Sequence, residues 1–221
     1  MKKLLSLFLL SCLLGPVSAE DGSRLWLRQS TDAHAQITAP RQSPTLNIAV
    51  RELKQAWKGL PVTLVLKKDK QLSSEGFRIR QVNGKLTVTS PSETGLLYAA
   101  YHLIRLQEMQ NFGKPSETDQ EITENPAYDL RILNHWDNLE RGYAGKSLWN
   151  WEELPGTLSD RYEAYARANA SIGINATVLN NVNASSKILS AEYLEKVKAL
   201  ADIFRPYGIK VYLSINFASP M

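Results

Sequence analysis

The sequence predicts an α/β protein in two parts: a small α+β domain, followed by a series of parallel βα units. Two observations carry this prediction. The elements expected in the first half run in the order strand, helix, strand, hairpin and helix, whereas strands and helices alternate from residue 128 onward. The chain also has 221 residues, 43% of them hydrophobic and 22% charged, which is globular composition for one or two domains.

Residues 1–19 have the pattern of a secretion signal. A basic start, Lys2 and Lys3, precedes an apolar stretch over residues 4–14, and small residues then lead to the end of the segment. We expect cleavage before Glu20, because the small residues suit a cleavage site. The apolar stretch is also too short to span a bilayer. The chain is therefore predicted to be secreted and to have no membrane span.

Cys12 is the only cysteine. A chain cleaved before Glu20 would therefore have neither disulfides nor thiolate metal sites. An exported protein that relies on packing alone suits a bacterial periplasm. One alternative stays open, because the segment Leu9-Leu10-Ser11-Cys12 is also compatible with a lipoprotein acylated on Cys12.

The first domain is predicted to cover residues 20–110. Short strands are expected at 24–28 and 33–38. Residues 45–58 are expected to form an amphipathic helix, because apolar residues recur there at helical spacing: Leu46, Val50, Leu53 and Trp57.

A strand at 62–66 follows this helix, and a hairpin follows the strand. Residues 77–82 and 85–89 read as strands, and they flank Asn83-Gly84. This dipeptide is the strongest short-range signal for a two-residue hairpin turn, since both positions favour a positive φ.

A second helix is expected at 94–109, with four residues on its apolar face: Leu97, Ala100, Tyr101 and Ile104. His102 lies in this helix without metal-spaced partners, which favours a packed or surface histidine. Residues 111–127 are polar and rich in turn formers, so we predict a linker and a domain boundary there.

The second domain is predicted to cover residues 128–221. Its expected strands and helices alternate: 130–133, 160–171, 176–179, 191–204 and 210–215. For the helix at 191–204, Ser190 is the expected N-cap and Gly208 the expected C-terminal stop. Its predicted apolar face comprises Leu194, Val197, Leu200, Ala201 and Phe204.

Each of the three strands in this second domain runs into a polar, asparagine-rich segment: residues 134–138, 180–183 and 216–219. In a (β/α)8 TIM barrel these ends share one face, which carries the active site. A doubly wound open sheet would show the same pattern. It is less favoured, because no glycine-rich phosphate loop follows the first strand. The sequence therefore predicts the first βα units of an incomplete barrel.

The segment after the first strand has the side chains of a sugar site. The indole of Trp136 suits stacking on a pyranose, and the neighbouring Asp137 and Asn138 suit hydrogen bonds to hydroxyl groups. Arg141 and Lys146 would suit a substrate carboxylate. The structural alternative stays open, with Trp136 closing the barrel mouth and Asp137 paired with Arg141.

Other residues near this segment favour structural roles. Asp137 and Glu140 lie three apart in one loop, so each is more easily a binding or loop-ordering group than half of a catalytic pair. His135 is expected on the other side of the strand, as a structural histidine or as one that supports a neighbouring binding residue. Trp149 and Trp151 suit either a platform for a polymer or packing over the barrel rim.

The charge distribution argues against nucleic-acid binding. The formal net charge is +4, but the cations are scattered among acidic residues without a basic block. We expect no nucleic-acid partner. No feature of the sequence indicates an oligomeric state.

Residues 130–147 together resemble the signature of the bacterial α-glucuronidases of glycoside hydrolase family 67. The resemblance continues through residues 172–175, 180–183 and 208–220. It implies removal of glucuronic acid, or its 4-O-methyl ether, from xylooligosaccharides during xylan breakdown, with inversion and without a metal or an organic cofactor. The partner would be a glucuronoxylan-derived oligosaccharide.

Within this resemblance Trp136 lines the glucuronate pocket and Val182 lies near the 4-O-methyl group. The further candidate binding residues are Asp137, Asn138, Arg141 and Asn181. The family pattern has further residues inserted between the positions of Leu139 and Glu140, which are adjacent in this chain. The shortened loop implies a reshaped pocket beside Trp136.

The family's catalytic acids come from later barrel strands, which we expect beyond residue 221, because a (β/α)8 barrel needs about 250 residues. This chain is accordingly expected to be an inactive fragment. Two other functions stay open: a non-catalytic carbohydrate-binding protein, and another exo-glycosidase such as a hexosaminidase.

Overall fold

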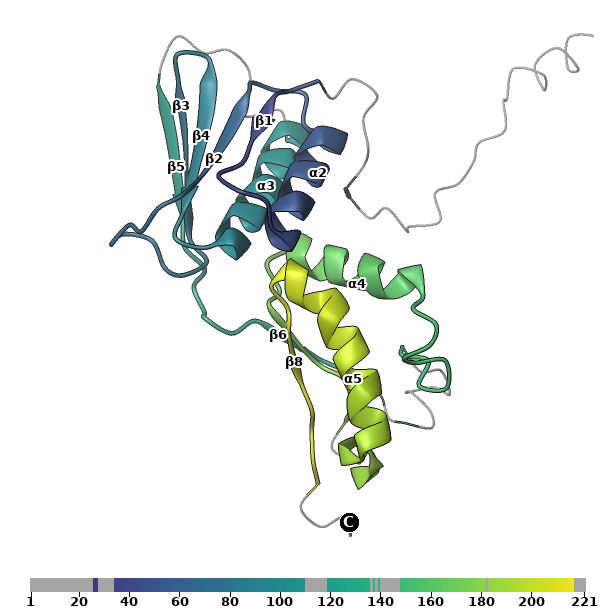
Figure 1. Cartoon of the computed structure of the whole chain (residues 1–221). Helices are drawn as coiled ribbons and strands as arrows, with labels where there is room; N and C mark the ends of the chain where they lie inside the picture. The colour runs from purple at the N-terminus through teal and green to yellow at the C-terminus, as the bar shows by residue number, and fades with distance from the viewer. Residues whose placement is uncertain are drawn as a thin grey trace, which may run out of the picture.

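The computed structural model describes residues 26–27, 34–109, 119–135, 137, 139, 148–181 and 183–216. Within these residues the chain forms two sheets, and each sheet has two helices on one face (Figure 1). The predicted signal over residues 1–19, with Cys12, lies outside the described residues. Every helix in the described part is too short or too polar to cross a bilayer.

The first sheet has the strand order β1-β2-β4-β3-β5. Its five strands are β1 Ile37–Thr38, β2 Val62–Leu66, β3 Phe77–Val82, β4 Lys85–Ser90 and β5 Gln120–Glu124. β1, β2 and β4 are parallel, while β3 is antiparallel to both β4 and β5. The helices α2, Pro44–Ala56, and α3, Glu93–Glu108, pack on the same face of this sheet.

Local sequence signals explain these elements. The side chain of Ser43 caps α2 by accepting a hydrogen bond from the Leu46 amide at 3.2 Å. Ser92 caps α3 in the same way through the Gly95 amide at 3.0 Å. The turn between β3 and β4 has positive φ at both Asn83 and Gly84, which confirms the predicted hairpin.

The start of the first domain differs from the prediction. Strands were expected at 24–28 and 33–38, but only Ile37–Thr38 forms a strand among the described residues. Leu27 is instead a buried anchor in the core, and Trp26 donates a hydrogen bond from its indole to the Ser171 hydroxyl at 3.2 Å. Their apolar character reflects packing on helices rather than a place in a sheet.

The predicted linker over residues 111–127 contains a strand, which corrects that interpretation. β5 pairs with β3 in antiparallel register, with Ile122 opposite Ile79, so the first sheet extends to Glu124. β5 forms a sheet edge, and Ile122 is its only partly covered residue. An exposed edge strand of polar residues lacks the alternating apolar pattern on which the prediction relied.

The second sheet has the order β6-β7-β8, and all three strands are parallel. Its strands are β6 Ile132–Asn134, β7 Ala176–Val178 and β8 Lys210–Tyr212. The helical segments among the described residues of this part are α4 Asp160–Ser171, η2 Ser186–Leu189, α5 Ala191–Phe204 and η3 Arg205–Tyr207. The predicted α/β class and the alternation of strands and helices are confirmed, and these three strands form an open sheet.

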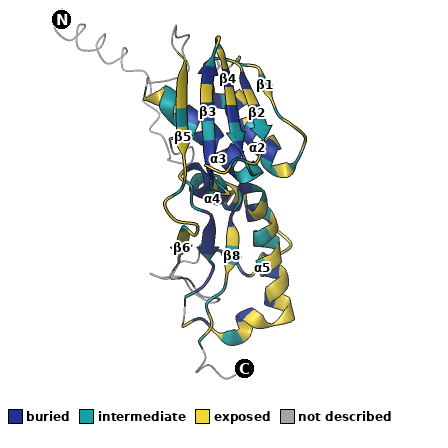
Figure 2. Cartoon of the chain, turned by 90° about the vertical axis from the view of Figure 1, so that its left-hand side faces the viewer, coloured by how far each residue is buried: buried dark blue, intermediate teal, exposed yellow. Residues whose placement is uncertain are grey.

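The predicted apolar face of α5 is confirmed at Leu200 and Phe204, which are fully buried, and is wrong at Leu194. Leu194 is 43% exposed, whereas Tyr193 and Lys196 are covered; Figure 2 shows the exposed outer side of this helix. The ring of Tyr193 packs against Trp151, and the ammonium group of Lys196 lies 4.6 Å from the Tyr193 ring centroid. The long stem of a lysine covers apolar surface while its head stays polar, which an apolar periodicity does not register.

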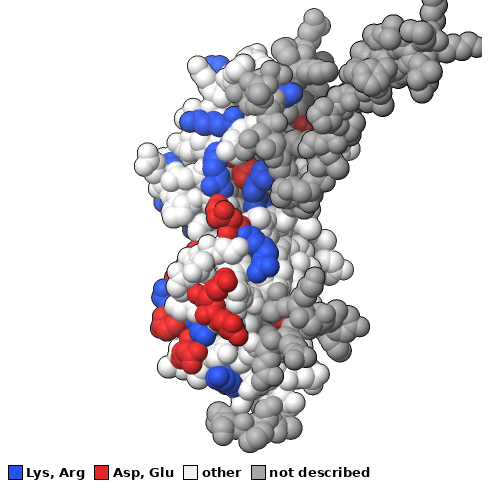
Figure 3. All heavy atoms as spheres, turned by 90° about the vertical axis from the view of Figure 1, so that its right-hand side faces the viewer, with Lys and Arg blue, Asp and Glu red and all other residues white. Residues whose placement is uncertain are grey.

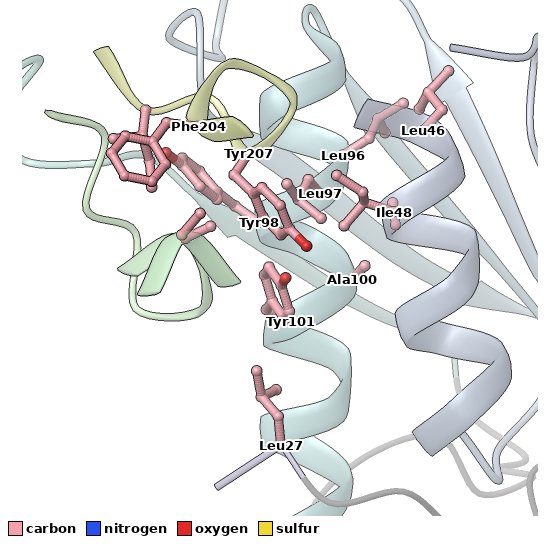
Figure 4. Packing of buried hydrophobic residues seen from close by; sticks show 14 of the residues in the cluster. Leu27, Leu46, Ile48, Leu96, Leu97, Tyr98, Ala100, Tyr101, Phe204 and Tyr207 are labelled. Atoms are coloured by element: carbon pink, nitrogen blue, oxygen red, sulfur yellow. The ribbon is translucent and has the colours of Figure 1, made fainter. Parts of the chain in front are cut away.

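One hydrophobic core joins the two parts of the chain. Tyr101 of α3 belongs to the same buried cluster as Phe204 at the end of α5 and Tyr207 of η3 (Figure 4). His102 is a packed histidine, as expected, with its ring 5.4 Å from that of Phe77. The second sheet is therefore held against the helices of the first.

Candidate functional site

The carboxyl ends of the three parallel strands lie at one edge of the second sheet. Asn134, Val178 and Tyr212 occupy equivalent positions at the ends of β6, β7 and β8. The polar segments that follow these strands therefore start side by side, at the lower end of the molecule in Figure 1. This is the shared edge that the sequence predicted.

Hydrogen bonds join the segments beyond the strand ends. The backbone amide of Asn181 donates to the carbonyl of Asp137 at 2.6 Å. The side chain of Asn180 donates to the Ser214 carbonyl at 2.7 Å and accepts from the Ser214 amide at 2.9 Å. The fully buried Asn180 amide thus imitates a peptide group and extends the sheet beyond β7.

Asp137 is 3% exposed, and its carboxylate accepts a hydrogen bond from the Leu148 amide at 2.6 Å. This contact ties the start of the loop after β6 to its end, eleven residues later. The geometry matches the loop-ordering role, which was one of the two roles that the sequence left open. Such charge-assisted bonds to backbone N–H groups are among the stronger hydrogen bonds in proteins.

Asn181 lies beside Asp137 and is half-buried. Its side-chain oxygen accepts from the Asn183 amide at 2.8 Å, which shapes the turn after β7. The other candidate binding residues lie outside the described residues: Trp136, Asn138, Arg141 and Val182. Glu140 and Lys146 lie outside them too.

A polar chain lies between the second sheet and α4. The Nε2 atom of His135 is 2.6 Å from the Tyr165 hydroxyl oxygen, which is 2.8 Å from Oγ1 of the buried Thr177. The His135 ring also makes an edge contact with Trp149, with ring centroids 5.8 Å apart. Burial lowers the pKa of His135 below its ordinary value of 6.5, although the Asp137 carboxylate partly opposes this shift. These contacts give His135 a structural role, which was one of the two that the sequence left open.

Both tryptophans before α4 are buried, so of the two roles that the sequence left open the structure shows packing and not an exposed platform for a polymer. The indole of Trp149 donates to the Leu179 carbonyl at 3.0 Å and packs against Tyr165 and Phe204. The Trp151 ring packs against that of Tyr193, with ring centroids 5.9 Å apart.

The part of the chain that the structure describes contains no cluster of three or more histidine, cysteine or acidic residues that could hold a metal ion. The described residues at the strand ends present carboxylate and amide groups, from Asp137, Asn180 and Asn181. These groups recognise the hydroxyls of sugars through paired hydrogen bonds.

A parallel sheet with polar strand ends, preceded by a small α+β unit, is an arrangement found in glycoside hydrolases. The fold is similar to that of a GH138 enzyme targeting pectin rhamnogalacturonan II, with a TM-score of 0.58 and 15% identity over 82% of this chain and 24% of that one. It is also similar to the GH20 β-N-acetylhexosaminidase from Streptomyces coelicolor, with a TM-score of 0.51 and 13% identity over 84% and 42%. At these identities the likeness concerns the fold alone.

The chain belongs to glycoside hydrolase family 67. The glycosyl hydrolase family 67 middle domain matches residues 111–221. The chain is 32% identical to α-glucuronidase A of Emericella nidulans over 97% of its own length, and 40% identical to the probable α-glucuronidase A of Aspergillus clavatus over 68% of its length.

The chain spans 31% of the Emericella nidulans protein and 18% of the Aspergillus clavatus protein. Both of these relatives are fungal, so a bacterial origin for this chain stays a prediction from the sequence.

Proposed function

We propose that this chain is the amino-terminal part of an α-glucuronidase that removes glucuronic or 4-O-methylglucuronic acid from xylooligosaccharides in xylan breakdown, with inversion. One observation carries the proposal: a family 67 chain presents the polar ends of three parallel strands at a single edge. In α/β enzymes this is where substrates bind.

One wall of the glucuronate pocket is proposed to consist of Trp136, Asp137, Asn138, Arg141, Asn181 and Val182. The 2.6 Å bond between the backbones of Asp137 and Asn181 supports this grouping. Trp136 directly precedes Asp137 and Val182 directly follows Asn181, so the two proposed pocket residues come from segments that are held together. The role of Asp137 would be to order the loop that carries Trp136.

We also propose that the second sheet is part of a (β/α)8 barrel. Ile132 and Tyr212 lie on the face away from the helices and are 37% and 40% exposed. In the described residues, β6 and β8 each pair only with β7. A barrel would cover that face and pair both edges, and its later strands would supply the catalytic acids.

The test combines binding and release. Isothermal titration calorimetry with xylotriose carrying one 4-O-methylglucuronate should give binding, whereas plain xylotriose should not. Trp136→Ala should abolish the binding. Tyr128→Ala should leave it unchanged, because this exposed aromatic precedes β6 and so lies at the opposite end of that strand from the pocket. This chain alone should release no 4-O-methylglucuronate.

Release should appear when this chain replaces the matching segment of the Emericella nidulans enzyme. A folded chimera that releases no uronic acid would contradict the proposal. A preference for N-acetylated sugars would favour a hexosaminidase. If the chain binds the xylotriose that carries 4-O-methylglucuronate but the chimera releases none, a non-catalytic carbohydrate-binding protein would be favoured.

Export is part of the proposal. The pattern of residues 1–19 supports secretion into a bacterial periplasm with cleavage before Glu20. Amino-terminal sequencing of the exported protein should begin at Glu20. A product that begins with an acylated Cys12 would show a lipoprotein instead.

A further inference from the structure

A groove of about 720 Å3 runs beside α2 in the first part of the molecule, away from the strand-end site. Its floor includes Ile37 of β1 and Val50 of α2. Six polar residues line it: Arg41, Gln42, Asn47, Arg51, Lys54 and Gln55. The volume lies in the range of about 300–1,000 Å3 that is usual for ligand sites.

The groove is lined by cations, of which Arg41 is paired with Glu93 and Arg51 with Glu163, so Lys54 supplies the positive charge that no ion pair offsets among the described residues. Three cations contribute to the lining, and no carboxylate does among the residues that line the groove. Figure 3 shows the right-hand side of Figure 1, where most of the Lys and Arg side chains lie over the upper part with some Asp and Glu among them, and where Asp and Glu gather over the lower part. An anionic ligand would therefore be attracted to this end of the face.

The two arginines of the groove are held in place from outside it. Arg41 donates from Nε to a Glu93 oxygen at 2.8 Å, and Arg51 donates from one terminal nitrogen to Glu163 and to Tyr207. Each guanidinium has five N–H donors, so donors remain for a ligand. Lys54 is exposed, and the structure records no ion pair for it within the described residues.

The amides of the groove add hydrogen-bonding capacity of the kind that sugars use. Gln42, Asn47 and Gln55 each offer a donor pair and an acceptor, which suits a row of hydroxyl groups. Asn47, Arg51 and Lys54 follow one another at helical spacing along one side of α2. A cation and amide row above an apolar floor is suited to an extended, carboxylated sugar chain.

We propose that this groove is a second carbohydrate site, which binds the uronate-bearing backbone of acidic xylan apart from the strand-end pocket. The substrate class rests on the proposed function. The groove lies in the first part of the molecule and the strand ends lie at the opposite end (Figure 1). It would hold the polymer on the protein surface, where its carboxylates meet Lys54 and the free donors of both arginines.

The test is affinity electrophoresis of the 221-residue chain in gels that contain glucuronoxylan. The chain should be retarded, and carboxyl-reduced glucuronoxylan should retard it much less. Lys54→Glu should weaken the interaction by roughly three- to tenfold, because an exposed charge contact is replaced by repulsion. Lys67→Glu is the matched control, since it makes the same charge change at an exposed position outside the groove.

Several results would overturn the inference. One is retardation that survives Lys54→Glu but disappears in Trp136→Ala, because the polymer would then be held at the strand ends. Others are equal retardation by carboxyl-reduced polymer, no retardation at all, or the same Lys54 dependence with a nucleic acid, which would show a general polyanion surface. Calorimetry with the short acidic oligosaccharide tests the strand-end pocket separately, so the two proposals fail independently.

Discussion

At the scale of single residues, the polar side chains at the strand ends form hydrogen bonds to the protein backbone, which fix the loops around the candidate site. The Asp137 carboxylate is occupied by the Leu148 amide, and the Asn180 side chain is occupied by the backbone of Ser214. Both were conspicuous in the sequence because of their type and position. The shared edge could be predicted from the sequence, whereas the use of each side chain could not, because it depends on partners eleven and thirty-four residues away.

His135 leads to a prediction about pH. Its folded pKa lies below 6.5 because of burial, so the unfolded chain binds more protons as the pH falls through that value. The free energy of unfolding should therefore decrease between about pH 7 and pH 5, where histidines titrate. His135→Gln should make this decrease shallower while keeping a polar group near Tyr165. Urea unfolding at a series of pH values measures the slope.

A comparison with His102 sharpens this experiment. Burial also lowers the pKa of His102, with Glu124 opposing the shift and Arg105 adding to it. His102→Gln should flatten the profile in the same direction, and the double variant should flatten it most. A double variant with the slope of the parent chain would show that the buried histidines do not set the pH dependence.

At the scale of elements, a capping residue and a turn dipeptide predicted the start of α5 and the hairpin correctly. The helix α5 begins after Ser190 and ends at Phe204 as predicted, because the Ser190 hydroxyl caps the Tyr193 amide. The failures have tertiary causes. β5 exists because β3 offers it a partner, and α5 buries Tyr193 rather than Leu194 because Trp151 lies against it. Neither the pairing of β5 with β3 nor the contact of Tyr193 with Trp151 can be read from local propensity or apolar periodicity.

Gly208 links α5 and η3 to β8, and its backbone can be tested directly. It has a φ of 76°, and an added Cβ would lie 2.5 Å from Cγ2 of Thr94. Gly208→Ala should therefore lower the free energy of unfolding by about 1–3 kcal/mol, through strain and a clash with α3. Chemical denaturation measures the change.

Gly156→Ala is the control for this substitution. An added Cβ there would meet only the Glu153 carbonyl at 3.5 Å, an ordinary contact, and the residue has no positive φ. Its stability should change by no more than about 0.5 kcal/mol. Equal effects at the two glycines would argue against strain at Gly208.

At the scale of the whole molecule, the two parts are joined by a core and by an ion pair between the buried Glu52 and the partly buried Arg167. Glu52 of α2 is 1% exposed and accepts two hydrogen bonds of 2.7 Å from Arg167 of α4. The residues are 115 positions apart, so no sequence pattern pairs them. The helices of the first part thus position the second sheet, and so they also position the edge where its strands end.

The ion pair gives the prediction for the whole fold. Arg167→Ala would leave the Glu52 carboxylate buried with only Arg51, 3.9 Å away, as a remaining cation. We expect a loss of about 3–5 kcal/mol, because a buried charge without its partner is costly.

Arg161→Ala, in the same helix but over the Tyr162 ring near solvent, should cost less than about 1 kcal/mol. Replacing both partners, as in Glu52→Leu with Arg167→Met, should recover most of the loss, since it removes the charge itself. Urea unfolding followed by both far-ultraviolet circular dichroism and tryptophan fluorescence measures these effects. If the two parts form one cooperative unit, the two probes should give coincident transitions; separate transitions, or an Arg167→Ala effect no larger than that of Arg161→Ala, would show that the pair does not couple them.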